Sequence, residues 1–111
     1  MEVDEFQGWM DDLHTGVHGG KFRNKGHEVE WLAAAIAGEA GEIIGETKRI
    51  TDRHAGDIPP YLRTNILTEL GDCIVYALEL AKVLDMPASV LLGLAGDKAA
   101  RWAEDRAGKP A

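Results

Sequence analysis

The sequence predicts an all-α protein of about four helices, and two observations carry this prediction. Apolar residues recur at helical spacing in four segments, and no segment shows the strict apolar/polar alternation that is typical of a strand. The segments are separated by short stretches rich in glycine, proline or charged residues, which end helices. The chain has 111 residues and no linker, so we expect residues 1–111 to form a single domain, a compact helical bundle.

The limits of the four predicted helices follow from this periodicity and from the residues that interrupt it. The first helix spans about residues 4–14, and the stretch TGVHGGKFRNKG after it is expected to be a loop. The second spans about residues 28–51 and the third about residues 61–84, where the prolines of DRHAGDIPP can open the third helix. The fourth spans about residues 88–106, with Asp85 as a plausible N-cap before it. The tail AGKPA is expected to fray.

The charge and composition of the chain exclude several classes of function. The formal net charge is -7, which argues against non-specific binding to nucleic acid or to an anionic membrane. The single cysteine, Cys73, excludes an intramolecular disulfide and a multi-cysteine zinc site. The N-terminus MEVDEFQGW lacks the apolar segment of a signal peptide, and no apolar run approaches the ~20 residues that span a bilayer. We therefore expect a cytoplasmic protein that binds neither nucleic acid nor a membrane.

Two of the predicted helices carry pairs of carboxylates beside an apolar stripe, in the same register. At about 100° per residue, Glu39 and Glu42 fall on one flank of the stripe of the second helix. Glu69 and Asp72 take the same two positions beside the stripe of the third helix. The two stripes consist of Val29, Leu32, Ile36, Ala40, Ile43, Thr47 and Ile50, and of Leu62, Ile66, Leu70, Cys73, Ala77, Leu80 and Leu84. Packing the stripes together would therefore bring four carboxylates into one cluster.

A cluster of four carboxylates predicts a site for a hard cation. Ionised carboxylates cannot sit together half-buried without compensating charge, and ligation by oxygen alone selects Mg²⁺ or Mn²⁺ over Zn²⁺. A single E-x-x-E is usually a solvated helix face, so the repetition of the pair carries the prediction. We expect Glu39, Glu42, Glu69 and Asp72 to be the ligands. Glu46, one turn after Glu42, is either an additional ligand or an exposed helix acid.

The stretches GEAGEIIGETKR and LTELGDCIVYALELA resemble the MazG-like all-α nucleoside triphosphate pyrophosphohydrolases, whose signature is E-x-x-E on one helix and E-x-x-D on the next. The resemblance covers about residues 27–102, and the relatives include dCTP pyrophosphatases, dimeric dUTPases and phosphoribosyl-ATP pyrophosphohydrolases. It implies that the four acids bind Mg²⁺ and that a nucleoside triphosphate is cleaved to the monophosphate and pyrophosphate, in cleaning or regulation of nucleotide pools. It also implies a homodimer or homotetramer. Glu39 or Glu42 could in addition orient or deprotonate the attacking water, and the sequence does not separate them.

Two residues before the first acidic motif are candidates for contacts with the base. His27 stands where the dCTP pyrophosphatase relatives have a histidine near the base pocket. Trp31 lies two turns before Glu39 and could stack on a base, with Trp9 close by. The plain structural alternatives are a histidine at a helix start and a tryptophan in the core. His14, His18 and His54 give no clear signal.

Basic residues in three segments are candidates for contacts with the phosphates, or else form solvated surfaces. Those of the glycine-rich loop are Lys21, Arg23 and Lys25, those after the first motif are Lys48 and Arg49, and those of the last helix are Lys98 and Arg101. The lysine and asparagine that relatives resembling dCTP pyrophosphatases carry on the last helix correspond here to Gly93 and Asp97. Lys98 or Arg101 could substitute for that lysine. The base preference therefore stays open.

Two other functions are compatible with the same residues. One is the phosphoribosyl-ATP reaction, which shares the chemistry but needs a larger pocket. The other is a helical oligomerisation or regulatory module whose acid cluster binds a metal without turnover. Gly38, Gly41 and Gly45 form a small-residue face opposite the stripe, which we expect to seat a neighbouring helix.

Overall fold

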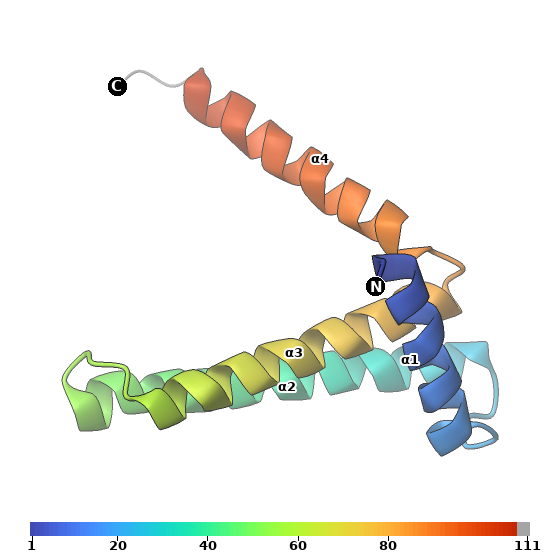
Figure 1. The fold of residues 1–111 in the computed structure, drawn as a ribbon, viewed down its shortest axis with the longest axis horizontal. Coiled ribbons are helices and arrows are strands. Elements are labelled where there is room, and N and C mark those ends of the chain that lie inside the picture. Colours follow the sequence, from blue (N-terminus) through green and yellow to red (C-terminus); the bar gives the residue numbers. More distant parts are fainter. Residues whose placement is uncertain (109–111) are drawn as a thin grey trace.

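The computed structural model describes residues 1–108, which form four α-helices joined by short connections (Figure 1). The helices are α1 (Val3–His18), α2 (Lys25–His54), α3 (Pro60–Val83) and α4 (Ala88–Ala107). Residues 1–108 contain no strand, so the prediction of an all-α fold is confirmed. Within the same residues, we find no helix with both the length and the apolar character of a transmembrane segment.

The two longest helices, α2 and α3, pack side by side as an antiparallel hairpin (Figure 1). The side chain of Asn24 caps α2 by accepting a hydrogen bond of 2.9 Å from the backbone N–H of His27. After α2, Ala55 and Gly56 adopt positive φ angles of 50° and 93° and reverse the chain. α3 then begins with Pro60 in its first turn, which confirms that the prolines open this helix.

α1 crosses one end of the hairpin, and a buried glutamine fixes it there (Figure 1). The side-chain amide of Gln7 donates hydrogen bonds to the carbonyls of Leu78 (3.1 Å) and Met86 (3.0 Å), while its oxygen accepts one from the backbone N–H of Ala88 (2.8 Å). One side chain of α1 therefore holds the end of α3, the connection after it and the start of α4. This crossing also covers the part of α3 that follows the acidic motif.

Several predicted helix limits are wrong, for identifiable reasons. α1 continues to His18 instead of ending near residue 14, and the turn comes only at Gly19 and Gly20, where Gly20 has a φ of 83°. Asp85 is not the N-cap of α4: it has a φ of 60° and pairs with Lys25 at 3.1 Å. Besides Gln7, the acceptor at the start of α4 is Asp4 of α1, which accepts hydrogen bonds from the N–H and hydroxyl of Ser89. These bonds lower the pKa of Asp4.

α2 and α4 are also longer than predicted. α2 begins three residues before residue 28 and ends three residues after residue 51, because Asn24 and the turn at residue 55 set its limits. Of the tail that was expected to fray, Ala107 is still helical. Gly108 is the C-cap of α4, and residues 109–111 lie outside the described residues.

The prediction of a compact bundle is wrong for the single chain. α4 projects away from the hairpin (Figure 1), and the radius of gyration is 17.5 Å, against about 13 Å for a compact domain of 100 residues. The buried apolar residues are few: Leu32, Leu62, Leu78, Ala81 and Ala88. Of the predicted stripes, Leu70 and Leu84 remain 45 % and 56 % exposed, and Ala40 and Thr47 are exposed as well.

The glycine face of α2 meets nothing within the chain. A Cβ atom added at Gly38, Gly41 or Gly45 would find no other atom within 4 Å, apart from the helix's own backbone and chain neighbours. The single chain therefore does not explain why these positions are glycine, and their expected contact with a neighbouring helix stays a prediction.

Candidate metal centre

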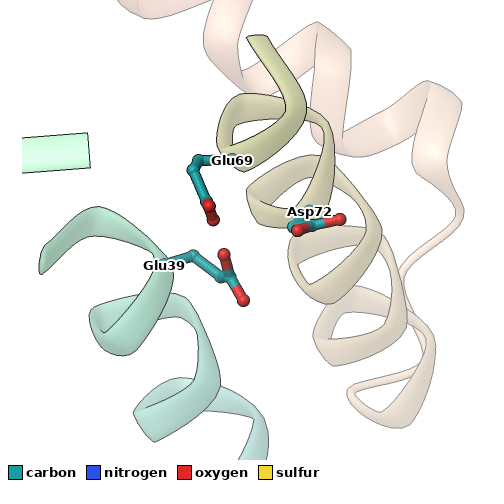
Figure 2. A group of neighbouring side chains, drawn as sticks. All are labelled: Glu39, Glu69 and Asp72. Atoms are coloured by element: carbon teal, nitrogen blue, oxygen red, sulfur yellow. The ribbon is translucent and has the colours of Figure 1, made fainter. Parts of the chain in front are cut away.

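Three of the four predicted acids meet where α2 and α3 pack against each other. Glu39 comes from α2, and Glu69 and Asp72 come from successive turns of α3 (Figure 2). One carboxylate oxygen from each residue lies within 4.8 Å of the other two. The grouping follows from the sequence pattern, because each acid stands beside an apolar stripe and the antiparallel packing of the stripes brings the flanks together.

Two oxygens of this acid cluster (Glu39, Glu69 and Asp72) are shielded from water and have no hydrogen-bond donor. They are the Oε2 atoms of Glu39 and Glu69, whose carboxylates point toward one another (Figure 2). A buried polar atom without a partner costs free energy, and the cost grows when the neighbouring groups carry the same charge. A bound cation would satisfy both oxygens at once, so these carboxylate oxygens fit the ligands that a hard divalent ion prefers.

Hydrogen bonding between neighbouring carboxyls, burial and the repulsion of the acids raise the pKa values of several groups. The Glu39 carboxylate raises the pKa of Glu69, and the Glu69 carboxylate raises the pKa of Glu42. Burial raises the pKa of Cys73, and the negative charges of Glu39 and Asp72 add to the increase. Each shift has the sign expected for excess negative charge around one point. The acid cluster is therefore a point of concentrated negative charge.

The remaining acids of α2 lie outside this group of three mutually close oxygens. Glu42 is exposed to solvent, next to Glu69. Glu46 accepts hydrogen bonds from Arg49 at 3.3 Å and from the side-chain amide of Asn65 on α3 at 3.4 Å. Glu46 therefore connects α2 to α3, and the structure gives it partners other than the acid cluster. Glu46 is therefore a partly buried, paired acid rather than an exposed one, and its role as a further ligand stays a prediction.

Trp31 is the centre of an aromatic group that a tyrosine joins to the acid cluster. Its ring lies 4.9 Å from His18, 5.5 Å from Phe22 and 6.1 Å from Tyr76, measured between centroids. The ammonium of Lys21 lies 4.8 Å from the Trp31 ring centroid, a cation–π distance. Tyr76 follows Asp72 by one turn of α3, and burial followed by the charge of Glu39 raises its pKa.

The structure brings few of the other predicted substrate contacts toward the acid cluster. The ring nitrogen Nδ1 of His27 accepts a hydrogen bond of 3.1 Å from the backbone N–H of Arg23, so His27 organises the loop before α2. Lys48 is exposed on α2. The exposed residues Lys98 and Arg101 lie on α4, which projects away from the hairpin (Figure 1). The ammonium of Lys98 lies 5.0 Å from the ring of Trp102.

Three further residues make contacts that the sequence did not indicate. Trp9 is 52 % exposed, and its ring centroid lies 6.1 Å from that of Phe6. The aromatic contacts within residues 1–108 do not join Trp9 to Trp31, although the two were expected to lie close together. Arg49 pairs with Glu46 and Lys25 pairs with Asp85. These two basic side chains therefore have acidic partners within the chain.

Besides Gln7, sequence reasoning missed two buried ionisable residues where α1 meets α3. His14 is 9 % exposed, and its Nε2 lies 3.0 Å from a carboxylate oxygen of Glu28. Glu79 is 1 % exposed. A signal for Glu79 exists in the sequence, because it is a lone acid in the apolar run CIVYALELA and follows Asp72 by seven residues, on the same helix face. No comparable signal marks His14, whose burial depends on how α1 crosses the hairpin.

Comparison with known proteins gave no match: no family model, no curated protein and no solved structure is similar enough to this chain to assign it to a family.

Proposed function

We propose that this protein is a Mg²⁺-dependent nucleoside triphosphate pyrophosphohydrolase of the MazG-like type, which cleaves (d)NTP to (d)NMP and pyrophosphate. The observation that supports this best is the acid cluster, in which oxygens of Glu39, Glu69 and Asp72 lie within 4.8 Å of one another. The two unpartnered oxygens of Glu39 and Glu69 are ligand atoms of the kind that a hard cation prefers. The paired E-x-x-E and E-x-x-D motifs supply the link to the reaction.

The residues of the chain divide the work between holding the cation and handling the water. Glu39, Glu69 and Asp72 would hold Mg²⁺ or Mn²⁺, which when bound neutralises phosphate oxygens and lowers the pKa of a coordinated water. Glu42 stands beside Glu69 and is exposed to solvent. Because it is not one of the three mutually close ligands, we assign it the role of general base that accepts the proton of the attacking water.

We also propose that the protein works as a homodimer or homotetramer. The exposed apolar side chains of α4 include Leu92, Leu94 and Trp102, at 56 %, 53 % and 63 % exposure. An apolar cavity of about 320 Å³ between Ile36, Ala77, Leu80 and Leu91 opens beside the start of α4. A chain with this much uncovered apolar surface is stabilised by association. Sedimentation velocity should show a species of two or four chains, and a stable monomer would contradict this part of the proposal.

Pyrophosphate release from a panel of eight common NTPs and dNTPs, with and without Mg²⁺, tests the proposed function. We expect turnover of at least one nucleotide in Mg²⁺, with equal amounts of monophosphate and pyrophosphate, and loss of turnover after chelation. Phosphate release in place of pyrophosphate would contradict the position of cleavage. No turnover of any nucleotide, together with tight metal binding, would contradict the enzyme and favour a non-catalytic metal-binding module.

A further inference from the structure

Glu79 on α3 is a buried acid that the proposed reaction does not use. Its side chain is shielded from solvent, and neither carboxylate oxygen has a hydrogen-bond partner in the structure. It lines a cavity of about 170 Å³ between α1 and α3, together with His14 and His18 of α1 and Tyr76 of α3. Burying a polar group without a partner costs free energy. A ligand that pairs with Glu79 in this cavity would remove that cost.

The charged groups around Glu79 come from three helices and are mostly acidic. They are Asp11 and the His14 ring of α1, Glu28 of α2 and Lys82 of α3. Burial, followed by the charge of Asp11, raises the pKa of Glu79 to about 7, while Lys82 acts in the opposite direction. A large fraction of Glu79 is therefore neutral at neutral pH. A neutral carboxyl donates one hydrogen bond through its O–H and accepts one through its carbonyl oxygen.

Two further groups of the cavity bear on what it can hold. The His14 ring is already held by Glu28 at 3.0 Å. Burial, followed by the nearby His14 and Lys21, lowers the pKa of His18, so His18 is largely neutral at neutral pH. Apart from Glu79, the other side chains of the cavity wall include the apolar Met10 and Leu13. The cavity is therefore an apolar and aromatic space lined by one carboxyl, whose neighbour within hydrogen-bonding reach is Asp11. A ligand that pairs with Glu79 takes the place of Asp11.

The cavity lies in line with the acid cluster along α3. Asp72, Tyr76 and Glu79 are at positions i, i+4 and i+7 and share one face of the helix, with Glu79 about 10 Å along the axis from Asp72. Tyr76 stands between them and packs against Trp31. Complete pockets for drug-sized ligands measure about 300–1,000 Å³. The smaller cavity thus suits one base of a nucleotide whose phosphates lie at the acid cluster.

We propose that Glu79 recognises the nucleotide base and selects an edge in which an exocyclic amine stands beside an unprotonated ring nitrogen. This inference rests on the proposed function. Cytosine presents that edge through N4 and N3, and adenine presents it through N6 and N1. The O–H of Glu79 donates to the ring nitrogen, and its carbonyl oxygen accepts from the amine. The carboxylates of Asp11 and Glu28 favour the positive amine hydrogens over the carbonyl oxygen that uracil, thymine and guanine carry at that position.

Steady-state kinetics on the same eight nucleotides, in Mg²⁺, test this inference. We expect the kcat/KM of cytosine or adenine nucleotides to exceed that of the others by at least about tenfold, the value of two ordinary hydrogen bonds, and the panel shows which of the two bases is used. Glu79→Leu should remove the preference through KM. Glu79→Gln should keep it, because a side-chain amide also offers an N–H donor beside a carbonyl acceptor. Asp12→Asn, an exposed acid of α1, is the control and should change nothing.

The outcomes separate this inference from the proposed function. Turnover without preference for an amino-bearing base, or an unchanged preference in Glu79→Leu, would overturn the inference and leave the enzyme standing. If Glu79→Leu does not fold, wild type and Glu79→Gln are compared at pH 6 and pH 9. Only the wild type should lose preference at pH 9, and equal behaviour would overturn the inference. If no nucleotide is hydrolysed, titrations of CMP, AMP, UMP and GMP followed by tryptophan fluorescence decide base selection independently, and equal affinities would overturn it.

Discussion

The acid cluster and Glu79 are carboxylates on the same helix that solve the problem of burial in different ways. Glu69 and Asp72 share their site with Glu39, and the three oxygens lie within 4.8 Å of one another. Glu79, seven residues further along α3, is the one acid among the residues that line an apolar and aromatic cavity, with Asp11 and Glu28 nearby. Three charges at one point can be relieved by a single divalent cation, whereas one isolated carboxyl is relieved by keeping its proton.

The difference teaches that position along one helix face decides what an acid can do. Near the middle of the hairpin, the antiparallel packing of α2 and α3 supplies a second acidic helix. Near the end of the hairpin, α1 crosses over α3 and replaces the second acidic helix with Leu13, His14 and other cavity-lining residues (Figure 1). We therefore expect substitutions at the two places to affect different quantities, chemistry at the acid cluster and pH-dependent stability at Glu79.

The largest effect is expected for the acid cluster. Asp72→Asn removes a ligand charge, and because metal ligation supplies several kcal/mol to the transition state, kcat/KM should fall at least about 10³-fold. Glu42→Gln should reduce kcat by about 10²–10⁴-fold, the range of general base catalysis. Pyrophosphate release measures both, and far-UV circular dichroism should show an unchanged helix content.

Glu46→Gln is the matched control for these two variants. It removes the same kind of charge from α2, but its partners in the structure are Arg49 and Asn65. An exposed or partly exposed pair contributes little, so activity should fall by less than about tenfold. A Glu46→Gln variant as inactive as Asp72→Asn would contradict the distinction between the acid cluster and Glu46.

The next effect concerns Glu79 and the pH dependence of stability. Its pKa is raised from 4.5 to about 7, so the folded protein binds a proton more tightly than the unfolded chain. The resulting stabilisation is complete below pH 4.5 and is lost as the pH rises through about 7. Relative to Glu79→Gln, which does not titrate, the free energy of unfolding of the wild type should fall by about 2 kcal/mol between pH 4.5 and pH 8.

Urea unfolding at pH 4.5, 6 and 8 measures this difference. Taking the difference between wild type and Glu79→Gln at each pH cancels the contributions of Glu42 and Glu69, whose pKa values are also raised. Parallel stability profiles for the two proteins would show that Glu79 titrates normally. The contrast between the two carboxylate environments would then be lost.

The smallest effect is expected at Cys73, the single cysteine of the chain, which follows Asp72. Burial is the largest cause of its raised pKa, and the charges of Glu39, Asp72 and Glu69 add to it. Saturating Mg²⁺ neutralises the charges but leaves the burial, so the pKa of the thiol should decrease while staying above its usual value. The pH dependence of alkylation measures the shift, and an identical profile with and without Mg²⁺ would place the cation elsewhere.

Much of the fold follows from local sequence patterns, and the errors lie where distant segments meet. The four helices are periodic in the sequence, and Pro60 marks the start of α3 as predicted. The meeting of Glu39 with Glu69 and Asp72 was also predictable, because each stands at the same angle beside an apolar stripe. Asp85 was expected to cap α4, but Asp4 of α1 does so. Asp4 reaches the start of α4 because α1 crosses the hairpin, and no local sequence pattern predicts this crossing.

The same reason explains what sequence reasoning missed in the candidate site. The burial of His14 and Glu79 and the orientation of α4 result from contacts between helices rather than from helical periodicity. The exposure of Leu70 and Leu84 has a different origin. Their apolar side chains favour burial, but the described residues of the single chain supply no surface that covers them.

The central claim is that Glu39, Glu69 and Asp72 together hold a divalent cation. Isothermal titration of Mg²⁺ and Mn²⁺ into the wild type, Glu39→Gln and Glu46→Gln tests it most directly, because it does not depend on any substrate. We expect binding to the wild type and to Glu46→Gln with similar affinity, and a loss of at least about tenfold in Glu39→Gln. Equal affinities in all three proteins, or no binding to the wild type, would contradict the account.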